Sequence, residues 1–308
     1  MYVQSRHWHL DPTPDRGAHV SGGFPPPAVA ERESVDTTLL GSAQRVLRAG
    51  TSFRSRVSVL LSILIVLLLW GAHDWSDRRA RVAWQKPLRV ALVLVAREPI
   101  PEGTLGLLTA RSFDLERRLA HEYARYTGHT ETPVEIVVRG VASEAEAPPS
   151  LEGDDLLDLV TYGARQWRWT SAIDSQARVE RGYDSRVYLV LKPAVGKEPA
   201  FVKGESEYGG RVGIAQADIA RDTVDFALFV VAHELFHTLG ATDKYDEQGH
   251  ARYPGGFAEP QRPRLYPQPG AEVMARGVPL APGFERAPET LDELYVGDAT
   301  ARELGWVR

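Results

Sequence analysis

The distribution of apolar and polar positions divides the chain into three parts. Residues 1–50 contain few apolar residues and several prolines, including the run at residues 25–27, which predicts a disordered tail. A start of translation nearer Val46 would also explain this composition. Residues 57–72 are almost wholly apolar and carry no charge. After them, short apolar runs alternate with apolar residues at helical spacing, which predicts a folded domain over residues 85–308.

The apolar stretch at residues 57–72 predicts a membrane-spanning helix. It would be roughly 24 Å long, slightly shorter than the ~30 Å hydrocarbon core of a bilayer. Trp70 and Trp75 lie where a membrane interface favours aromatic rings, and arginines flank the stretch, namely Arg48, Arg54, Arg56, Arg78, Arg79 and Arg81. A buried core helix and a cleaved signal peptide are alternatives, but Trp70 stands where a cleavage site needs a small residue. We therefore expect residues 51–80 to form a single-pass signal anchor, with the following domain outside the cytoplasm.

Beyond residue 85 the periodicity alternates between strand and helix. Continuous β-rich apolar runs predict strands at residues 88–95, 133–138 and 187–191. Apolar residues at helical spacing predict helices at residues 112–128, 154–175, 223–239 and 290–304. The glycine-rich run at residues 209–217 predicts an edge strand, whose free backbone groups would pair with an extended peptide.

Three of these segments carry more specific predictions. Ser112 is expected to cap the N-terminus of the first helix. The helix at residues 223–239 is apolar around most of its circumference and should be buried at the centre of the domain. The apolar side of the helix at residues 154–175 is expected to consist of Leu156, Leu157, Leu159, Val160 and Trp167. Polar or Pro- and Gly-rich composition predicts loops at residues 142–149 and 246–289.

Composition limits the functions that the chain can have. Its 308 residues are 43% hydrophobic and 25% charged, with a net charge of −5, so nothing indicates nucleic-acid binding. The sequence contains no cysteine, which excludes disulfides, thiolate metal sites and a cysteine nucleophile. Any metal must therefore be held by nitrogen and oxygen ligands.

The most informative motif lies at the end of the buried helix. His233 and His237 are four residues apart, so they project from the same face and can hold one metal ion. Glu234 follows the first histidine, where its carboxylate can reach a water molecule on that metal. Gly240 ends the helix, and the sharp turn after it would let Asp243 return as a third ligand.

This donor set predicts a catalytic zinc site. Such sites use three protein ligands and leave the fourth position to water, whose pKa falls to about 7 on the metal. Glu234 would act as general base while the water attacks a carbonyl carbon. The same pattern arises by chance on exposed helices, but two histidines and a glutamate would be costly in so apolar a helix without partners.

Residues 233–243 resemble the H-E-x-x-H-x-x-G-x-x-D signature of the metzincin zinc metallopeptidases. They are most similar to the snapalysin-type subset, in which aspartate replaces the third histidine. The longer stretch to Asp246 also resembles peptidases of the immune-inhibitor-A type. The resemblance implies an α+β zincin fold: a mixed twisted sheet with an active-site helix, here preceded by a single transmembrane helix. It also implies zinc as the cofactor and a peptide or protein as the substrate.

Metzincins also carry a methionine turn beneath the zinc. Met274, within residues 271–277, occupies the corresponding place, and a plain core position is the alternative. Some metzincins have a tyrosine two residues further on, as a ligand or oxyanion partner. Arg276 stands there instead, either as an oxyanion or substrate contact or as a surface charge. Candidates for the phenol are Tyr245, Tyr266 and Tyr295.

The third ligand has alternatives. If Asp243 does not bind the metal, the candidates are Asp246, Glu247 and Glu272. Asp243 and Asp246 would otherwise help to bind a structural calcium ion.

The sequence thus predicts a membrane-anchored zinc peptidase. One alternative is a non-catalytic zinc-containing envelope protein that binds a peptide or protein partner. Another is a zinc hydrolase that acts on a non-peptide amide.

Overall fold

A computed structural model describes residues 3–8, 53–143, 147–151, 153, 155–193, 202–207 and 209–307. Contacts divide the chain into two compact units, residues 11–77 and residues 1–10 with 78–308. The second unit contains the sheet and the residues of the predicted metal site.

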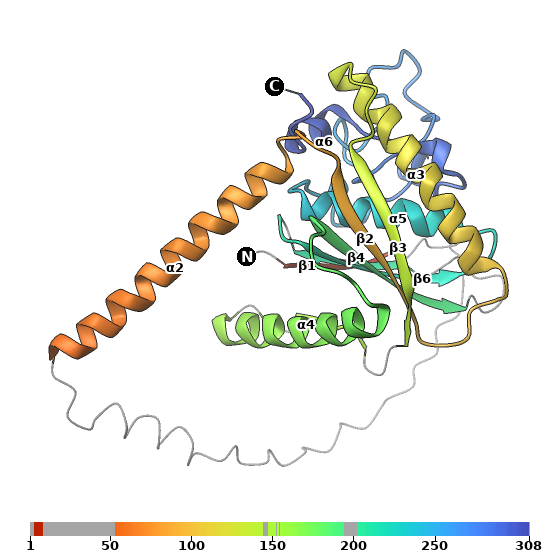
Figure 1. Cartoon of the computed structure of the whole chain (residues 1–308). Helices are drawn as coiled ribbons and strands as arrows, with labels where there is room; N and C mark the ends of the chain where they lie inside the picture. Colours follow the sequence, from red (N-terminus) through yellow and green to blue (C-terminus); the bar gives the residue numbers. More distant parts are fainter. Residues whose placement is uncertain are drawn as a thin grey trace, which may run out of the picture. The chain divides into compact units, whose positions relative to one another are not determined.

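Six strands form one mixed sheet in the order β1-β5-β6-β4-β2-β3 (Figure 1). Their bounds are β1 Val3–Trp8, β2 Leu88–Ala96, β3 Val134–Ser143, β4 Ser185–Pro193, β5 Val202–Glu207 and β6 Val212–Ile219. The strands from β6 to β3 are parallel, whereas β5 runs antiparallel to β6 and β1 antiparallel to β5. The three strands predicted from apolar runs are confirmed as β2, β3 and β4. Strand β3 continues to Ser143, so the loop predicted from residue 142 begins later.

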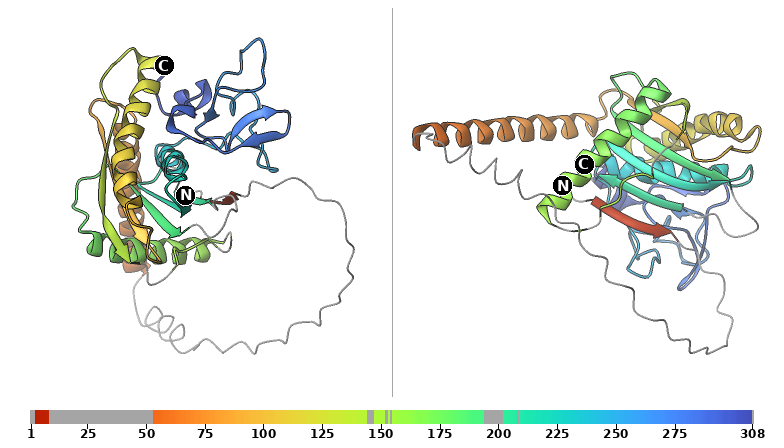
Figure 2. Two further views of the ribbon diagram at one scale, coloured as in Figure 1. Left: turned by 90° about the vertical axis from the view of Figure 1, so that its right-hand side faces the viewer. Right: turned by 90° about the horizontal axis from the view of Figure 1, so that it is seen from below.

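Helices cover both faces of this sheet (Figures 1 and 2). The described helices are α2 Phe53–Arg81, α3 Thr104–Thr127, α4 Leu156–Ala177, α5 Val224–Thr238 and α6 Asp298–Glu303, of which α3 and α5 lie on one face of the sheet and α4 on the other. In β2, Val90 and Leu92 belong to the core under α3 and α5, whereas Ala91 and Val93 belong to the core under α4. Successive strand residues point to opposite faces, and both faces are covered, which explains why β2 is apolar without alternation.

Helix α3 begins earlier than predicted. The expected N-cap Ser112 is wrong, because this residue is buried inside the helix and its Oγ donates to the carbonyl oxygen of Thr109 at 2.7 Å. The helix follows Gly103, whose φ of 78° interrupts the helical backbone. Leu108 is fully buried, so the apolar face of the helix extends upstream of the predicted start.

Helix α4 presents a different side to the sheet from the one predicted. Tyr162, Trp169 and Ile173 are buried in the core beneath it. Leu157 and Trp167, expected on the inner side, are exposed. The sequence of this helix contains two apolar stripes, and the stripe with the larger aromatic rings packs against the sheet.

Strand β6 covers most of the glycine-rich run, but it is not an edge. Strand β5 pairs with it antiparallel, and β1 pairs with the outer side of β5. The prediction of an edge strand at residues 209–217 is therefore wrong. Strand β1 lies within the segment expected to be disordered, and residues 1, 2 and 9–50 of that segment lie outside the described part of the chain.

Helix α5 is buried along almost its whole length at the centre of the domain, as predicted. It packs against α3 and the sheet on the same side. Gly240, with a φ of 99°, turns the chain directly after it, in a conformation that favours glycine.

The C-terminal part contains short elements between turns. They are β7 Ala271–Glu272, β8 Val278–Ala281, β9 Phe284–Arg286, the 3₁₀ helix η1 Leu291–Glu293 and β10 Leu294–Tyr295. The helix predicted at residues 290–304 is reduced to α6 at its end. The apolar residues before it instead form β10, which pairs parallel with β7.

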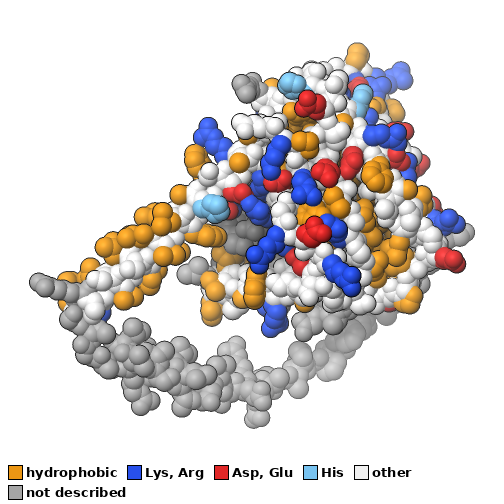
Figure 3. Space-filling view, viewed as in Figure 1, with side chains coloured by type: hydrophobic (Ala, Val, Ile, Leu, Met, Phe, Trp, Pro, Cys, Tyr) orange, Lys and Arg blue, Asp and Glu red, His pale blue; other side chains and the backbone are white. Residues whose placement is uncertain are grey.

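Helix α2 is, among the described residues, the one helix long and apolar enough to cross a membrane, by length and composition. Its apolar side chains face solvent along its length (Figure 3). Arg81, expected to be a membrane flank, lies within the folded domain: it is buried, and its guanidinium donates to the carbonyl oxygens of Gly209, Gly210 and Thr238 at 2.9, 2.6 and 3.1 Å. It therefore stabilises the C-terminal end of α5.

Candidate metal centre

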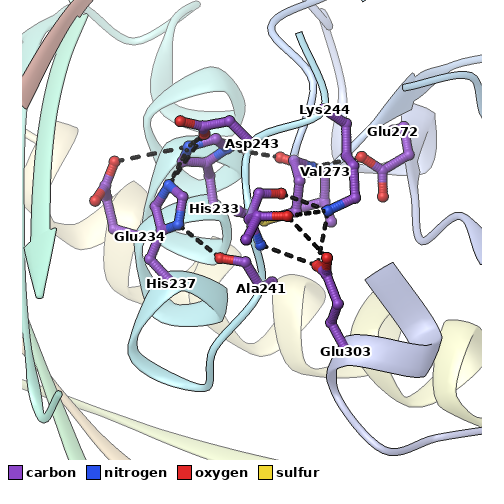
Figure 4. A network of polar contacts seen from close by, with 11 residues as sticks. His233, Glu234, His237, Ala241, Asp243, Lys244, Glu272, Val273 and Glu303 are labelled. Atoms are coloured by element: carbon purple, nitrogen blue, oxygen red, sulfur yellow. Dashed lines mark hydrogen bonds and ion pairs between the residues drawn. The ribbon is translucent and has the colours of Figure 1, made fainter. Parts of the chain in front are cut away.

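Helix α5 places His233 and His237 side by side near its C-terminal end. Both side chains are buried, and their Nε2 atoms are 3.0 Å apart (Figure 4). The Nδ1 atom of His233 lies 2.9 Å from the carbonyl oxygen of Val273, and that of His237 lies 2.9 Å from the carbonyl oxygen of Ala241. Each imidazole is thus oriented by a backbone acceptor on its far side.

These two backbone contacts determine the tautomers. A carbonyl oxygen only accepts, so each Nδ1 must carry the hydrogen. In the neutral rings, both Nε2 lone pairs then point into the same small space. Two acceptors at 3.0 Å repel each other unless a proton or a cation lies between them. Nδ1–H donation to a backbone carbonyl is also the usual way in which proteins orient a metal-binding histidine.

The turn at Gly240 brings the carboxylate of Asp243 close to the Nε2 atoms of both histidines. Its Oδ1 lies 3.3 Å from Nε2 of His233 and 3.1 Å from Nε2 of His237. Both carboxylate oxygens are buried, and neither has a hydrogen-bond partner within the described part of the chain. Burial alone would raise the pKa of Asp243, but the two histidines outweigh it and hold that pKa far below its usual range. The carboxylate is therefore ionised and aimed at the two imidazoles.

The neighbouring carboxylates also act on His237. Burial alone would lower the pKa of His237, but the contact with Asp243 and the negative charges of Asp243 and Glu234 raise it above its usual value. The cluster therefore attracts positive charge even though it is buried.

Glu234 stands beside this cluster and is itself buried. Its Oε1 is 4.0 Å from Nε2 of His233, and donor atoms of His233, Glu234 and His237 all lie within 4.8 Å of one another. Figure 4 shows its carboxylate on the opposite side of His237 from the Ala241 carbonyl. It can reach an atom held by the cluster without taking the place of Asp243.

Met274 is fully buried in the turn that follows β7. The preceding residue, Val273, supplies the carbonyl oxygen that orients His233. Glu272 fixes this turn: its carboxylate accepts hydrogen bonds from the backbone N–H of Met274 at 2.8 Å, the N–H of Gly297 at 3.1 Å and the hydroxyl of Thr300 at 2.6 Å. The hydrogen bonds of Glu272 thus join this turn to the start of α6 and are not made to the histidines.

The loop that carries Asp243 is held from a distant part of the chain. Glu303, in α6, accepts hydrogen bonds from the backbone N–H of Thr242 at 2.9 Å and from its hydroxyl at 2.8 Å. It also pairs with the ammonium of Lys244 at 2.7 Å (Figure 4). The residues on both sides of Asp243 are therefore fixed, a role for Glu303 and Lys244 that the sequence did not reveal.

The other predicted candidates have different surroundings. Asp246 closes its own turn, accepting the backbone N–H groups of Gln248 and His250. The ring of Tyr295 lies under the guanidinium of Arg118, 4.9 Å away, and Tyr266 packs against Phe257.

Arg276 and Tyr245 lie together. The guanidinium carbon of Arg276 is 5.8 Å from the centre of the Tyr245 ring. Burial lowers the pKa of Arg276, whereas the nearby Tyr245, Glu285 and Asp243 act in the opposite direction. The arginine is half-buried, so it is not a plain surface charge.

The residues present fit a bound zinc ion. Two imidazole nitrogens and one carboxylate converge, and this nitrogen and oxygen set matches the three protein ligands of catalytic zinc sites. A buried carboxylate without a hydrogen bond is costly, and a cation at this point would remove that cost.

Fold and site together define the class: a mixed-sheet α/β domain with a buried His-His-Asp cluster and an adjacent glutamate. No family model and no curated protein matches the chain. Among solved structures, archaemetzincin from Methanopyrus kandleri matches with 19% sequence identity and a TM-score of 0.30, over 53% of this chain and 79% of that one. At this level of likeness, only the geometry of the site bears on function.

Proposed function

We propose that this chain is a membrane-anchored, zinc-dependent peptidase of metzincin-like type. The observation that carries the proposal is the convergence of two Nε2 lone pairs with the buried, unbonded carboxylate of Asp243. A helix with only structural histidines has no need of this arrangement.

His233, His237 and Asp243 would hold the zinc ion. Bound zinc would supply a water molecule of lowered pKa and polarise the substrate carbonyl. The carbonyl oxygens of Val273 and Ala241 fix the ring orientations that this requires. Met274, which is buried and follows the Val273 carbonyl that contacts His233, would correspond to the methionine turn of the resemblance.

Glu234 would be the general base. It accepts a proton at a carboxylate oxygen as water attacks the carbonyl carbon of a peptide bond, then gives that proton to the leaving amine nitrogen. Arg276 and Tyr245, which lie together, are candidates to contact the oxyanion or the substrate.

Helix α2 would anchor the chain, with the catalytic domain outside the cytoplasm. Its length, its composition and its exposed apolar side chains support this proposal. The substrate would be a peptide or protein, and no nucleic acid is involved.

A non-catalytic zinc-containing envelope protein that binds a peptide or protein partner is the second candidate. Glu234 argues against it, because a zinc site that only stabilises a fold has no use for a buried carboxylate beside its ligands.

The test compares the wild type with Glu234→Gln and His233→Ala. We expect Glu234→Gln to keep stoichiometric zinc by elemental analysis while cleavage of a broad peptide panel falls steeply. His233→Ala should lose the zinc and destabilise the domain, because metal binding is coupled to folding. A Glu234→Gln protein with normal turnover would refute the role of Glu234 as base. A wild type that binds zinc but cleaves nothing in the panel would favour the second candidate.

A further inference from the structure

The outer face of α4 carries an apolar stripe that the folded domain leaves exposed. Leu157, Val160, Ala164 and Trp167 follow one another at intervals of three and four residues, so they share one narrow face of the helix. The large side chains are 70%, 60% and 72% exposed for Leu157, Val160 and Trp167. Single exposed apolar residues are ordinary, but an aligned row that includes tryptophan indicates an interaction surface.

The stripe leads into a pocket with basic walls. Ser171 and Ser175 continue the same face of α4 and line a pocket of about 530 Å³. The charged residues around this pocket are Arg181, Arg186 and Arg211, with Asp174 and Glu180. Arg186 forms an ion pair with Asp174, and the three arginines against two carboxylates give the lining a net positive charge. The surface thus offers an apolar strip at one end and cationic groups at the other.

We propose that this face of α4 docks on the surface of a bilayer that contains anionic phospholipid. The apolar stripe would enter the boundary between headgroups and acyl chains, as interfacial helices do. Trp167 is a residue type favoured at that depth, and Arg168 beside it is exposed as well. The arginine-lined pocket would receive a lipid phosphate.

The proposal rests on the membrane anchoring by α2 proposed above. A short tether keeps the domain close to the bilayer, so that even a weak surface contact is made in a large fraction of molecules. An anchored domain is always near the bilayer, and tryptophan, arginine and aliphatic side chains are the residue types found at membrane surfaces. Lipid is therefore a better match for this surface than a soluble protein partner.

The absence of cysteine makes the test direct, because a single introduced cysteine can be labelled selectively. The full chain with Ala164→Cys would carry an environment-sensitive fluorophore in phosphatidylcholine vesicles, with and without phosphatidylglycerol. Quenching by nitroxide groups on the acyl chains reports contact with lipid. Ser62→Cys in α2 reports anchoring, and Arg117→Cys on the exposed side of α3 is the aqueous control.

We expect the labels at positions 62 and 164 to be quenched and the label at position 117 not. Leu157→Ser with Trp167→Ser should abolish the quenching at position 164 while zinc content stays unchanged, which shows that the domain remains folded. Arg181→Gln with Arg211→Gln should reduce that quenching only in vesicles with phosphatidylglycerol. Added inorganic phosphate should have no effect; a loss of quenching would mean that the pocket binds free phosphate.

Three other outcomes would overturn the proposal. Quenching at position 62 without quenching at position 164 would refute the docking of α4 and leave the anchor intact. Quenching at neither position would refute the anchor, and the docking with it. If the label at position 164 reports an increasingly apolar environment as the protein concentration rises, but is not quenched by the labelled lipid, this face binds a second copy of the chain. Peptidase activity is not used in any of these measurements.

Discussion

Glu303 offers the sharpest test of how the fold positions the metal ligands. Its carboxylate accepts two hydrogen bonds from Thr242 and forms an ion pair with Lys244. These two residues stand on either side of Asp243. Glu303→Gln keeps the size of the side chain but removes its charge. One of the two oxygens is replaced by an amide NH2 group, which cannot accept a hydrogen bond, and Lys244, which is almost completely buried, loses its carboxylate partner.

The size of the effect follows from these contacts. Hydrogen bonds to charged groups contribute about 1.5–3 kcal/mol each, and the remaining amide oxygen preserves some of them. We expect the free energy of unfolding to fall by about 1.5–3 kcal/mol in the zinc-free protein. Loss of a residue that orients a ligand typically weakens metal binding about 10–100-fold, and we expect zinc affinity to fall within that range.

Zinc affinity would be measured by competition with a chromophoric chelator, and stability by urea unfolding in excess chelator. Glu289→Gln is the matched control, because Glu289 is exposed and its pair with Arg286 spans 3.7 Å. Stability that falls while zinc affinity stays unchanged would show that Glu303 supports the fold without positioning Asp243. No change in either quantity would refute the reasoning altogether.

Three further predictions concern other parts of the chain. Asp243→Asn should weaken zinc binding more than Asp246→Asn, measured by the same competition; the reverse order would make Asp246 the ligand. Arg81→Gln should lower the free energy of unfolding by about 1.5–3 kcal/mol, because its guanidinium binds the last carbonyl of α5, and thermal unfolding in detergent checks this. A chain with Ser5→Cys and Glu205→Cys should form a disulfide in detergent, since these positions are directly paired between β1 and β5, but not when the chain is inserted in a membrane.

The local part of the site could be predicted from the sequence because it lies within one helix and the turn after it. Helical spacing alone brings His233 and His237 together, and Gly240 returns the chain toward them. The structure also brings Asp243 to that point, as expected. Glu303 could not be found in this way, because α6 reaches the loop only through the tertiary fold.

The errors in the fold have equally physical causes. The edge position predicted for residues 209–217 failed because β5 is polar and short, with the sequence Val-Lys-Gly-Glu-Ser-Glu, and carries no strand periodicity of its own. Its place in the sheet depends on pairing with β6. The orientation of α4 failed because its sequence has two apolar stripes, and periodicity alone cannot say which of them the sheet covers.

The position of β1 sets a condition on the whole chain. A helix that crosses a bilayer places the residues before it and the residues after it on opposite sides of the membrane. Strand β1 precedes α2 and β5 follows it, so the two strands can pair only while α2 does not cross the bilayer. In a spanning chain, the outer edge of β5 therefore has no β1 along it and can pair with an extended peptide. The disulfide experiment separates the two arrangements, with Val3→Cys and Lys203→Cys as the control, roughly 13 Å out of register. A disulfide between positions 5 and 205 in membrane-inserted protein would show that α2 does not cross the bilayer, whatever its composition indicates.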